Sequence, residues 1–520
     1  MNDQDDAARA GTGKKKAKVT ESTTMLVKFV PTNEDAVNPN HTLDLPLSAT
    51  TVQLEATVNA LVKQKPTDDS VPFAFYLETE KDHFVELTGT LLEAVQEHQL
   101  GTEAVLKVRY QPLALFKVRP VTRLTDNLSG HEEAILHVQF SPNGDALASG
   151  GGDATVRFWD VNTMTPKHVC KGHKNHVLCT SWSPDGKLYA SGDRNGEIRL
   201  WDPSTGKLLY SLVGHKKWIT SLSWEPLHRT NTPRLVSGSK DTTARVWDCT
   251  TGRCDATLTA HTDSVECVLW GGEGLVYTAS RDRTITCWFE DLKDGFKIAR
   301  TLLGHAHRVN SLAISNGHAC RTGAYDCEEE IVQNHLEKKG KAVSSTTVDL
   351  SLHERAVARY AKSKASQGDS DQCPFERLVS CSDDFTLFLW YPTSHKRPVL
   401  RMTGHVQPVT HLSFSPDGRF LASASFDKKV KLWDGRTGRF LHTCQGHVGR
   451  VYQVSWSPDS RLFASASQDS TIKVWEARAP ERAKFTLSGH YDEVYALDWS
   501  PNGEILATGS KDRLVKVWRS

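Results

Sequence analysis

The chain lacks the features that mark secreted, membrane-spanning or disulfide-bonded proteins. Its 520 residues contain no apolar run of the roughly 18 residues that a membrane-spanning helix needs. The first residues are acidic and then basic, with no apolar core, so a secretory signal peptide is not expected. The 11 cysteines include no Cys-x-x-Cys pair. This pattern argues against a disulfide framework or a zinc site and favours a reducing compartment.

The sequence also lacks a strong charge of one sign and a catalytic motif. The formal net charge is +1, so no overall attraction to nucleic acid or to an anionic membrane is expected. Residues 11–14, Gly-Thr-Gly-Lys, lack the first glycine and the final hydroxyl of a phosphate-binding loop. No cluster of metal-ligating residues is evident. We therefore expect no enzymatic activity, and no cofactor or metal of the protein's own.

What the chain does contain is a repeat. Eight Gly-His or Ala-His pairs lie 42 to 46 residues apart, except for one interval of 100. A tryptophan closes each unit, and Asp or Glu follows it in five of the eight. A period of roughly 40–45 residues with these marks is typical of WD repeats, each of which forms one four-stranded blade. The sequence therefore predicts a mainly β protein in which residues 114–520 form an eight-bladed β-propeller.

Each unit carries further polar residues at fixed spacing. A Ser or Thr stands ten residues before each Trp, and an Asp stands six residues before it, except for Asn195 in the second unit. We predict that the His, hydroxyl, Asp and Trp of each blade form a buried hydrogen-bonded chain, weaker in the second blade. A nucleophile is not needed eight times, so we interpret these groups as architecture. In the first and sixth blades they are His131, Ser149, Asp153, Trp159, His405, Ser423, Asp427 and Trp433.

The ring needs a closing strand and tolerates one interruption. The last repeat has no room for a fourth strand, and the apolar segment 115–121 is predicted to supply it. The fifth unit contains an insertion at 316–376, in which residues 350–363 have the pattern of a short helix. Two interpretations of the insertion stay open, a tolerated surface loop and a docking arm.

The residues that follow each Gly-His pair are predicted to lie on one rim of the propeller. They are acidic in blades eight and one, and basic or aromatic in blades two, three, five and seven. Such a rim suits docking on a composite surface such as a ribonucleoprotein, and a merely solvated rim is the alternative. The predicted docking residues are Lys174, His176, Lys216, Lys217, Trp218, His307, Arg308 and Arg450.

The chain ahead of the repeats has a different pattern. Residues 1–21 are predicted to be a disordered basic tail, in which residues 14–18 resemble a nuclear import signal. Over residues 22–113 the apolar pattern predicts two strands, a helix, two strands, a short helix and a last strand. That order resembles an α+β ubiquitin-like (β-grasp) domain. No Gly-Gly ends it, so we expect recognition rather than conjugation.

A ubiquitin-like domain ahead of an eight-bladed WD propeller resembles the Notchless family of large-subunit ribosome assembly factors. Matching stretches include FKVRPVTR at 116–123, WITSLSWEPLH at 218–228 and DDFTLFLW at 383–390. The resemblance implies a non-catalytic factor of the nucleolus and nucleoplasm that docks on pre-60S particles, contacting their proteins and rRNA. It also implies that the MIDAS domain of the AAA ATPase midasin grips the ubiquitin-like domain and couples ATP-driven remodelling to large-subunit maturation.

The resemblance places one partner-binding residue in the small domain. The family's ligand is a Glu in a Thr-Glu turn before the last strand, and here that residue is Glu103. Glu103 is expected to complete the coordination of the Mg²⁺ in the MIDAS domain, since Mg²⁺ prefers hard oxygen ligands. Without the resemblance it would be an ordinary exposed acid. Glu86, Glu93 and Glu97 are the alternatives.

Two other functions stay open. Residues 433–436, Trp-Asp-Gly-Arg, fit the Trp-Asp-x-Arg pattern with which some propellers bind ubiquitin-ligase adaptors. The chain would then be a ligase substrate receptor. The family name reflects a link to Notch signalling, which the residues neither support nor exclude, so a signalling scaffold is the other alternative.

Overall fold

The chain divides into two compact units, Met1–Leu115 and Phe116–Ser520. The computed structural model describes residues 24–31, 42–62, 73–79, 83–87, 90–97, 105–112, 118–291, 293–325, 350–367 and 374–520. The predicted tail and Glu103 lie outside these residues. In the described ranges, no helix is long and apolar enough to cross a membrane.

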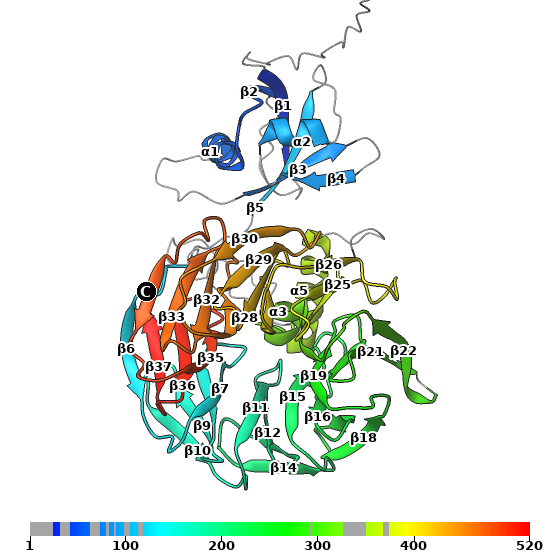
Figure 1. The fold of residues 1–520 in the computed structure, drawn as a ribbon, viewed down its shortest axis with the longest axis vertical. Coiled ribbons are helices and arrows are strands. Elements are labelled where there is room, and N and C mark those ends of the chain that lie inside the picture. The colour runs from blue at the N-terminus through cyan, green and yellow to red at the C-terminus, as the bar shows by residue number, and fades with distance from the viewer. Residues whose placement is uncertain are drawn as a thin grey trace, which may run out of the picture. The chain divides into compact units, whose positions relative to one another are not determined.

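The N-terminal unit is a five-stranded sheet with two helices (Figure 1). Its elements are β1 (Thr24–Pro31), β2 (Thr42–Pro46), α1 (Thr51–Val62), β3 (Phe73–Thr79), β4 (His83–Glu86), α2 (Leu91–Glu97) and β5 (Leu106–Pro112). The sheet order is β2-β1-β5-β3-β4, with β1 and β5 parallel. The element order is the one that the apolar pattern predicts for a β-grasp domain.

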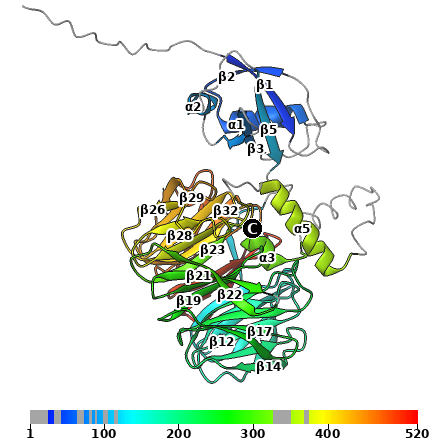
Figure 2. The same cartoon turned by 90° about the vertical axis from the view of Figure 1, so that its right-hand side faces the viewer.

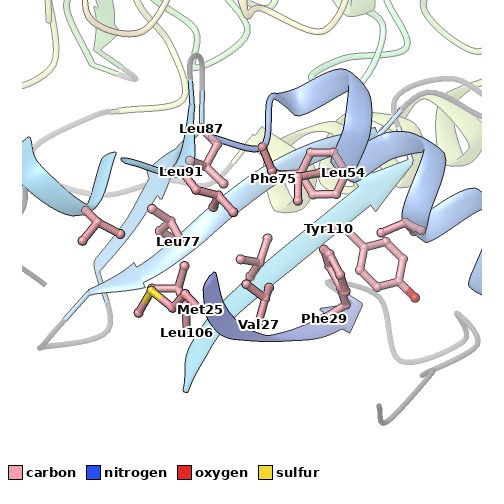
Figure 3. Close-up of a cluster of buried hydrophobic side chains, with 14 of the residues drawn as sticks. Met25, Val27, Phe29, Leu54, Phe75, Leu77, Leu87, Leu91, Leu106 and Tyr110 are labelled. Carbon is pink, nitrogen blue, oxygen red and sulfur yellow. The ribbon is translucent and has the colours of Figure 1, made fainter. Parts of the chain in front are cut away.

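Alternation along the strands builds the core of this unit. Successive side chains of a strand point to opposite faces, and Met25, Val27 and Phe29 of β1 are at most 3% exposed. Figure 3 shows these side chains with those of β3, β5 and the two helices in one apolar cluster. On α1, Leu54 and Val58 are four residues apart, so they share the face that joins this cluster.

The C-terminal unit is a closed ring of eight four-stranded antiparallel sheets (Figure 1). The innermost strand of each blade contacts that of the next, and the last contacts the first. From the centre outward, blade one contains β7 (Ile135–Phe140), β8 (Ala146–Gly151), β9 (Val156–Asp160) and β10 (Pro166–Cys170), and blade two contains β11 (Val177–Trp182), β12 (Tyr189–Asp193), β13 (Glu197–Trp201) and β14 (Leu208–Val213). Blade three contains β15 (Ile219–Trp224), β16 (Arg234–Ser239), β17 (Ala244–Asp248) and β18 (Arg253–Leu258). Blade four contains β19 (Val265–Trp270), β20 (Val276–Ser280), β21 (Thr284–Asp291) and β22 (Gly295–Leu303).

The remaining blades repeat this plan. Blade five contains β23 (Val309–Ile314), β24 (Leu378–Ser382), β25 (Leu387–Trp390) and β26 (Leu400–Met402), and blade six contains β27 (Val409–Phe414), β28 (Phe420–Ser425), β29 (Val430–Asp434) and β30 (Phe440–Cys444). Blade seven contains β31 (Val451–Trp456), β32 (Leu462–Ser467), β33 (Thr471–Glu476) and β34 (Phe485–Ser488). Blade eight contains β35 (Val494–Trp499), β36 (Ile505–Ser510), β37 (Val515–Arg519) and β6 (Arg123–Leu128).

The eighth blade borrows its outer strand from the start of the propeller. β6 pairs antiparallel with β37, and Figure 1 shows the cyan strand beside the red one. The predicted closing strand at 115–121 is therefore wrong, because the pairing begins at Arg123. Val118 and Val121 instead pack among buried side chains of blades seven and eight. The predicted segment is too apolar for a half-exposed outer strand, and the amphipathic 123–128 takes that place.

The insertion of blade five leaves between β23 and β24. It contains α3 (Gly317–Thr322) and α5 (Leu352–Gln367), and α5 confirms the helix predicted at 350–363 but begins two residues later and ends four residues later (Figure 2). Arg321 of α3 donates two hydrogen bonds to Asp498 of blade eight, at 2.6 and 2.9 Å, and lines a central cavity of about 550 Å³. Tyr360 of α5 stacks on His228 of blade three, with ring centres 3.8 Å apart. The described part of the insertion thus joins blades on different sides of the ring.

Candidate docking surface

Seven of the eight blades contain a continuous hydrogen-bonded chain from Trp to Asp. In blade one, Trp159 Nε1–H donates to Ser149 Oγ at 2.9 Å, and Ser149 Oγ lies 2.8 Å from His131 Nε2. His131 Nδ1 lies 2.9 Å from Asp153. With the ring neutral and protonated at Nδ1, Ser149 donates to Nε2 and Nδ1–H donates to the carboxylate. Each group then has a partner.

Blade six repeats the chain. Trp433 Nε1–H donates to Ser423 Oγ at 2.9 Å, and His405 lies 2.8 Å from Ser423 and 2.7 Å from Asp427. Burial lowers the pKa of His405, so the imidazole is neutral at physiological pH. Burial alone would raise the pKa of Asp427, but the interactions with His405 and the backbone N–H groups of Lys429 and Val406 together outweigh it, and the pKa is lowered. The blade therefore holds a carboxylate beside a neutral histidine.

The aspartate of the network also holds a strained turn between the second and third strands of its blade, as blade one shows. Asp153 accepts the backbone N–H groups of Thr155 and Glu132, both at 3.1 Å. Ala154, which lies between Asp153 and Thr155 in this turn, has φ of 59°. This left-handed conformation costs a non-glycine residue about 1–2 kcal/mol. The corresponding residue of six further blades also has positive φ and is not glycine: Thr242, Arg283, Phe385, Lys428, Ser470 and Arg513. The aspartate therefore joins this turn to the Gly-His loop.

Blade two has a different turn and a different carboxylate beside its histidine. Asn195 is exposed at the usual aspartate position, and Gly196 takes the left-handed conformation, with φ of 93°. Glycine adopts this conformation without strain. The carboxylate near His173 Nδ1 comes instead from buried Asp193, at 3.4 Å, against 2.7 to 3.0 Å in the other blades. Sequence reasoning missed Asp193, although an acid at this position of the repeat was a visible signal.

These Ser, His and Asp groups cannot act on a substrate. Ser149 and Ser423 are 0% exposed, and His131 and His405 are 6% exposed. A nucleophile has to reach a substrate, and these hydroxyls are sealed between strands. Within the described residues, no group of three or more His, Cys, Asp or Glu side chains could hold a metal ion.

The glycine of each Gly-His pair makes room for a side chain of the third strand. A Cβ on Gly130 would lie 2.5 Å from the guanidinium of Arg157, which donates to the Gly130 carbonyl. Five other blades place Arg or Lys at the position of Arg157. Blade four, where Ala260 replaces the glycine, has the smaller Thr286 there. This pairing of residues across the blade was readable in the sequence, two residues before each Trp.

The predicted rim residues fall into different environments. Arg308 lies 2.6 Å and His307 3.7 Å from the carboxylate of Asp383, so the charge of Arg308 is partly neutralised. The guanidinium of Arg450 lies 4.9 Å from the ring centre of Phe426. His176 lies 3.9 Å from Glu133.

A second group of rim residues lies in blades two and three. The side chains of Lys174, Lys216 and Lys217 are exposed there. Trp218 is half-buried beside them. The predicted rim is therefore several local surfaces, of which this one has the least compensated charge.

The Trp-Asp-x-Arg sequence is used inside its own blade. Asp434 accepts the backbone N–H of Arg436 at 2.8 Å, and the Arg436 side chain is half-buried. Burial raises the pKa of the Asp417 carboxyl, and the nearby charge of Arg436 opposes that rise. An arginine engaged in this way is poorly placed to bind an adaptor.

Fold and repeat marks together define a WD-repeat propeller protein with an N-terminal β-grasp unit. The family model "WD domain, G-beta repeat" matches seven stretches: 122–160, 164–202, 206–248, 252–288, 396–434, 438–476 and 482–519. The interrupted fifth blade lies between the fourth and the fifth of them. The family model "NLE (NUC135) domain" matches residues 25–93. Among solved structures, the computationally designed Ika8 protein is similar, with a TM-score of 0.56 and 25% identity over 76% of this chain and 98% of that chain.

The chain belongs to the Notchless family. It is 44% identical over 390 residues to Protein Notchless of Drosophila melanogaster, covering 74% of this chain and 73% of that protein. It is 46% identical to the Notchless protein homolog of Arabidopsis thaliana, covering 79% and 80%. It is 40% identical to Ribosome assembly protein 4 of Saccharomyces cerevisiae, covering 78% and 77%.

The blade network predicts a pH-dependent stability. Replacing Asp427→Asn should lower the free energy of unfolding by about 1–3 kcal/mol at neutral pH, because His405 and the turn lose a charged acceptor. The folded-state pKa of Asp427 is lowered below its ordinary 3.8. Its stabilisation is therefore complete above about pH 4 and is lost as the pH falls through the folded-state pKa. The difference between variant and wild type should shrink over the same range.

Denaturant unfolding at several pH values measures this difference. Asn195→Ala is the matched control, because the same repeat position in blade two is exposed and lies beside a glycine turn. It should change the free energy of unfolding by less than about 0.5 kcal/mol. An Asp427→Asn effect that is equal at pH 7 and pH 3, or no larger than that of the control, would contradict the role of the carboxylate.

Proposed function

We propose that this protein is a non-catalytic ribosome biogenesis factor that docks on pre-60S particles through its propeller. The observation that carries the proposal is its identity to two fungal proteins named Ribosome assembly protein 4, each 40% over about three quarters of both chains. The proposed partners are the proteins and rRNA of the particle. The proposed location is accordingly the nucleolus and nucleoplasm.

The shape and chemistry of the propeller support a docking role. Its repeated polar groups are buried and hydrogen-bonded to one another within the blades, so they are not free for catalysis. The same groups fix the loops of the Gly-His rim, because the backbone N–H after the histidine donates to the aspartate in seven blades. The side chains at this point thus leave a rigid loop and reach solvent. A rigid surface of this kind binds without a large ordering cost.

The second half of the proposal concerns the N-terminal unit. We infer that the MIDAS domain of a midasin-type AAA ATPase engages this unit through Glu103, which completes the coordination of the partner's Mg²⁺. Glu103 lies between α2 and β5, outside the described residues. β5 pairs with both β1 and β3. A force applied at the segment before it would therefore pass into the middle of the sheet, which suits ATP-driven remodelling.

Removal of the Glu103 carboxylate should abolish binding to the MIDAS domain. Glu103→Ala deletes the ligand, and Glu103→Asp retracts it by one methylene, which a Mg²⁺ site with strict geometry does not accommodate. A binding assay with purified full chain, purified MIDAS domain and Mg²⁺ measures the loss. Glu97→Ala is the matched control and should bind as wild type does. Wild-type affinity in either Glu103 variant would refute the assignment, and loss in the control alone would move it to Glu97.

Association with the particle tests the proposed function as a whole. Affinity purification of the tagged full chain, followed by sucrose-gradient sedimentation, should recover the chain together with large-subunit precursors. A chain confined to the free fractions would contradict the proposal. Recovery of a ubiquitin-ligase adaptor in place of precursor rRNA would favour the substrate-receptor alternative.

A further inference from the structure

The rim of blades two and three carries five cations at neighbouring positions. They lie in the loops before β11 and β15 and in the turns after β12 and β16, and they are Lys174, Arg194, Lys216, Lys217 and Lys240. Over the ranges that the structure describes, none of the five forms an ion pair. Elsewhere on this rim, Arg308 pairs with Asp383 at 2.6 Å and Lys511 with Asp492 at 3.5 Å. The sector therefore keeps a positive charge that other blades neutralise.

Two of these cations share one aromatic ring. Arg194 Cζ lies 4.4 Å and Lys240 Nζ 4.0 Å from the ring centre of Trp218. The backbone fixes them there, since Lys240 N–H donates to the Trp218 carbonyl at 3.0 Å and Arg194 N–H to the His176 carbonyl at 3.1 Å. The ring attracts each cation, while the two positive charges held at one ring repel each other. A bound anion would relieve that repulsion.

The departure of blade two from the repeat changes where the carboxylate of that blade lies. Asn195 is exposed where seven blades place Asp, while the carboxylate of Asp193 is fully buried. Gly196 also lets the loop of blade three approach closely, because a Cβ there would lie 2.7 Å from the Lys217 carbonyl oxygen. The exchange that weakens the blade network thus moves the carboxylate of blade two to a fully buried position and lets the backbone of the Lys217 loop lie against Gly196.

A groove lies within the sector. Its volume is about 410 Å³, and Lys174 and Arg199 line it together with Asn195 and Gly196. Glu197 also lines it, but this carboxylate is already bonded to Arg199 at 2.9 Å and to Ser211 at 2.6 Å. The charge of Glu197 is offset by that of Arg199, so Lys174 leaves the groove with a net positive charge.

We propose that this sector binds the phosphate backbone of RNA. The inference rests on the proposed docking on a ribosomal precursor and names the chemistry of one contact. Four of the five cations are lysines, which bind phosphates as point charges, and the fifth is an arginine, whose fork also matches a phosphate. Trp218 cannot serve as the buried aromatic anchor typical of a protein interface, because cations already cover its ring. Cations spread over adjacent loops suit successive phosphates of one strand.

Charge reversal in the full chain tests the site. Lys216→Glu combined with Lys217→Glu leaves the blade network intact, because these residues contribute only backbone groups to it, the Lys216 N–H and the Lys217 carbonyl. The probe is a fluorescein-labelled single-stranded RNA of about 20 nucleotides, followed by anisotropy between about 50 and 200 mM KCl. We expect at least about 10-fold weaker binding at low salt. The slope of log affinity against log salt should fall by about 1.4, or about 0.7 for each lost phosphate contact.

The matched control reverses the same amount of charge on the other rim, in the neighbouring blade two. Lys187 and Lys207 are exposed in the turns between β11 and β12 and between β13 and β14, and Lys187→Glu with Lys207→Glu should bind RNA as wild type does. Equal loss in both double variants, or no loss in either, would overturn the proposal. Binding of polyglutamate but not RNA by the wild-type chain would overturn it in favour of an acidic protein.

The outcomes separate this inference from the proposed function. If the wild-type chain does not bind the RNA but still sediments with large-subunit precursors, the RNA site fails and the biogenesis role stands. If the chain is absent from precursors, the biogenesis role fails whatever the anisotropy shows.

Discussion

The hydrogen bond between a buried carboxylate and a histidine is the interaction on which the propeller depends. In seven blades one aspartate accepts a hydrogen bond from the histidine and caps a turn that contains a residue in the left-handed conformation. The same aspartate accepts a hydrogen bond from the backbone N–H that follows the histidine in the Gly-His loop. Because the turn joins the second and third strands and the loop leads into the first, one side chain fixes three strands. The chain of hydrogen bonds continues through a sealed hydroxyl to the tryptophan that fills the gap between blades. A similar set of groups performs catalysis in enzymes, and here its burial assigns it to architecture.

This arrangement explains how similar blades carry different surfaces. The network uses backbone groups of the rim loops, so the side chains that follow the histidine are free to vary. Exposed valines in blades six and seven and lysines in blades two and three stand on loops of the same kind. Blade two goes further, because glycine in its turn removes the strain that elsewhere demands aspartate. Its carboxylate then comes from buried Asp193, and the exposed residue at the usual aspartate position is uncharged.

Sequence spacing was enough to predict the number of blades and the order of elements in the small domain, because both follow from periodic burial. It predicted closure of the ring but misplaced the strand, since Val118 and Val121 are apolar for packing between blades rather than for pairing. The carboxylate of Asp193 was missed because it comes from a different position of the repeat. The ion pair between Arg308 and Asp383 joins residues 75 positions apart. Which rim cations remain uncompensated therefore depends on contacts that spacing alone does not reveal.

We propose that the rim of the Gly-His loops is the face that meets the ribosomal precursor. Lysine footprinting with an amine-reactive reagent can test this on the free chain and on the chain within purified precursor particles. Lys174, Lys216 and Lys217 should be modified in the free chain and protected in the particle, while Lys187 and Lys207 on the opposite rim stay more reactive. Protection of the opposite rim, with the Gly-His rim as reactive in the particle as in the free chain, would contradict the account.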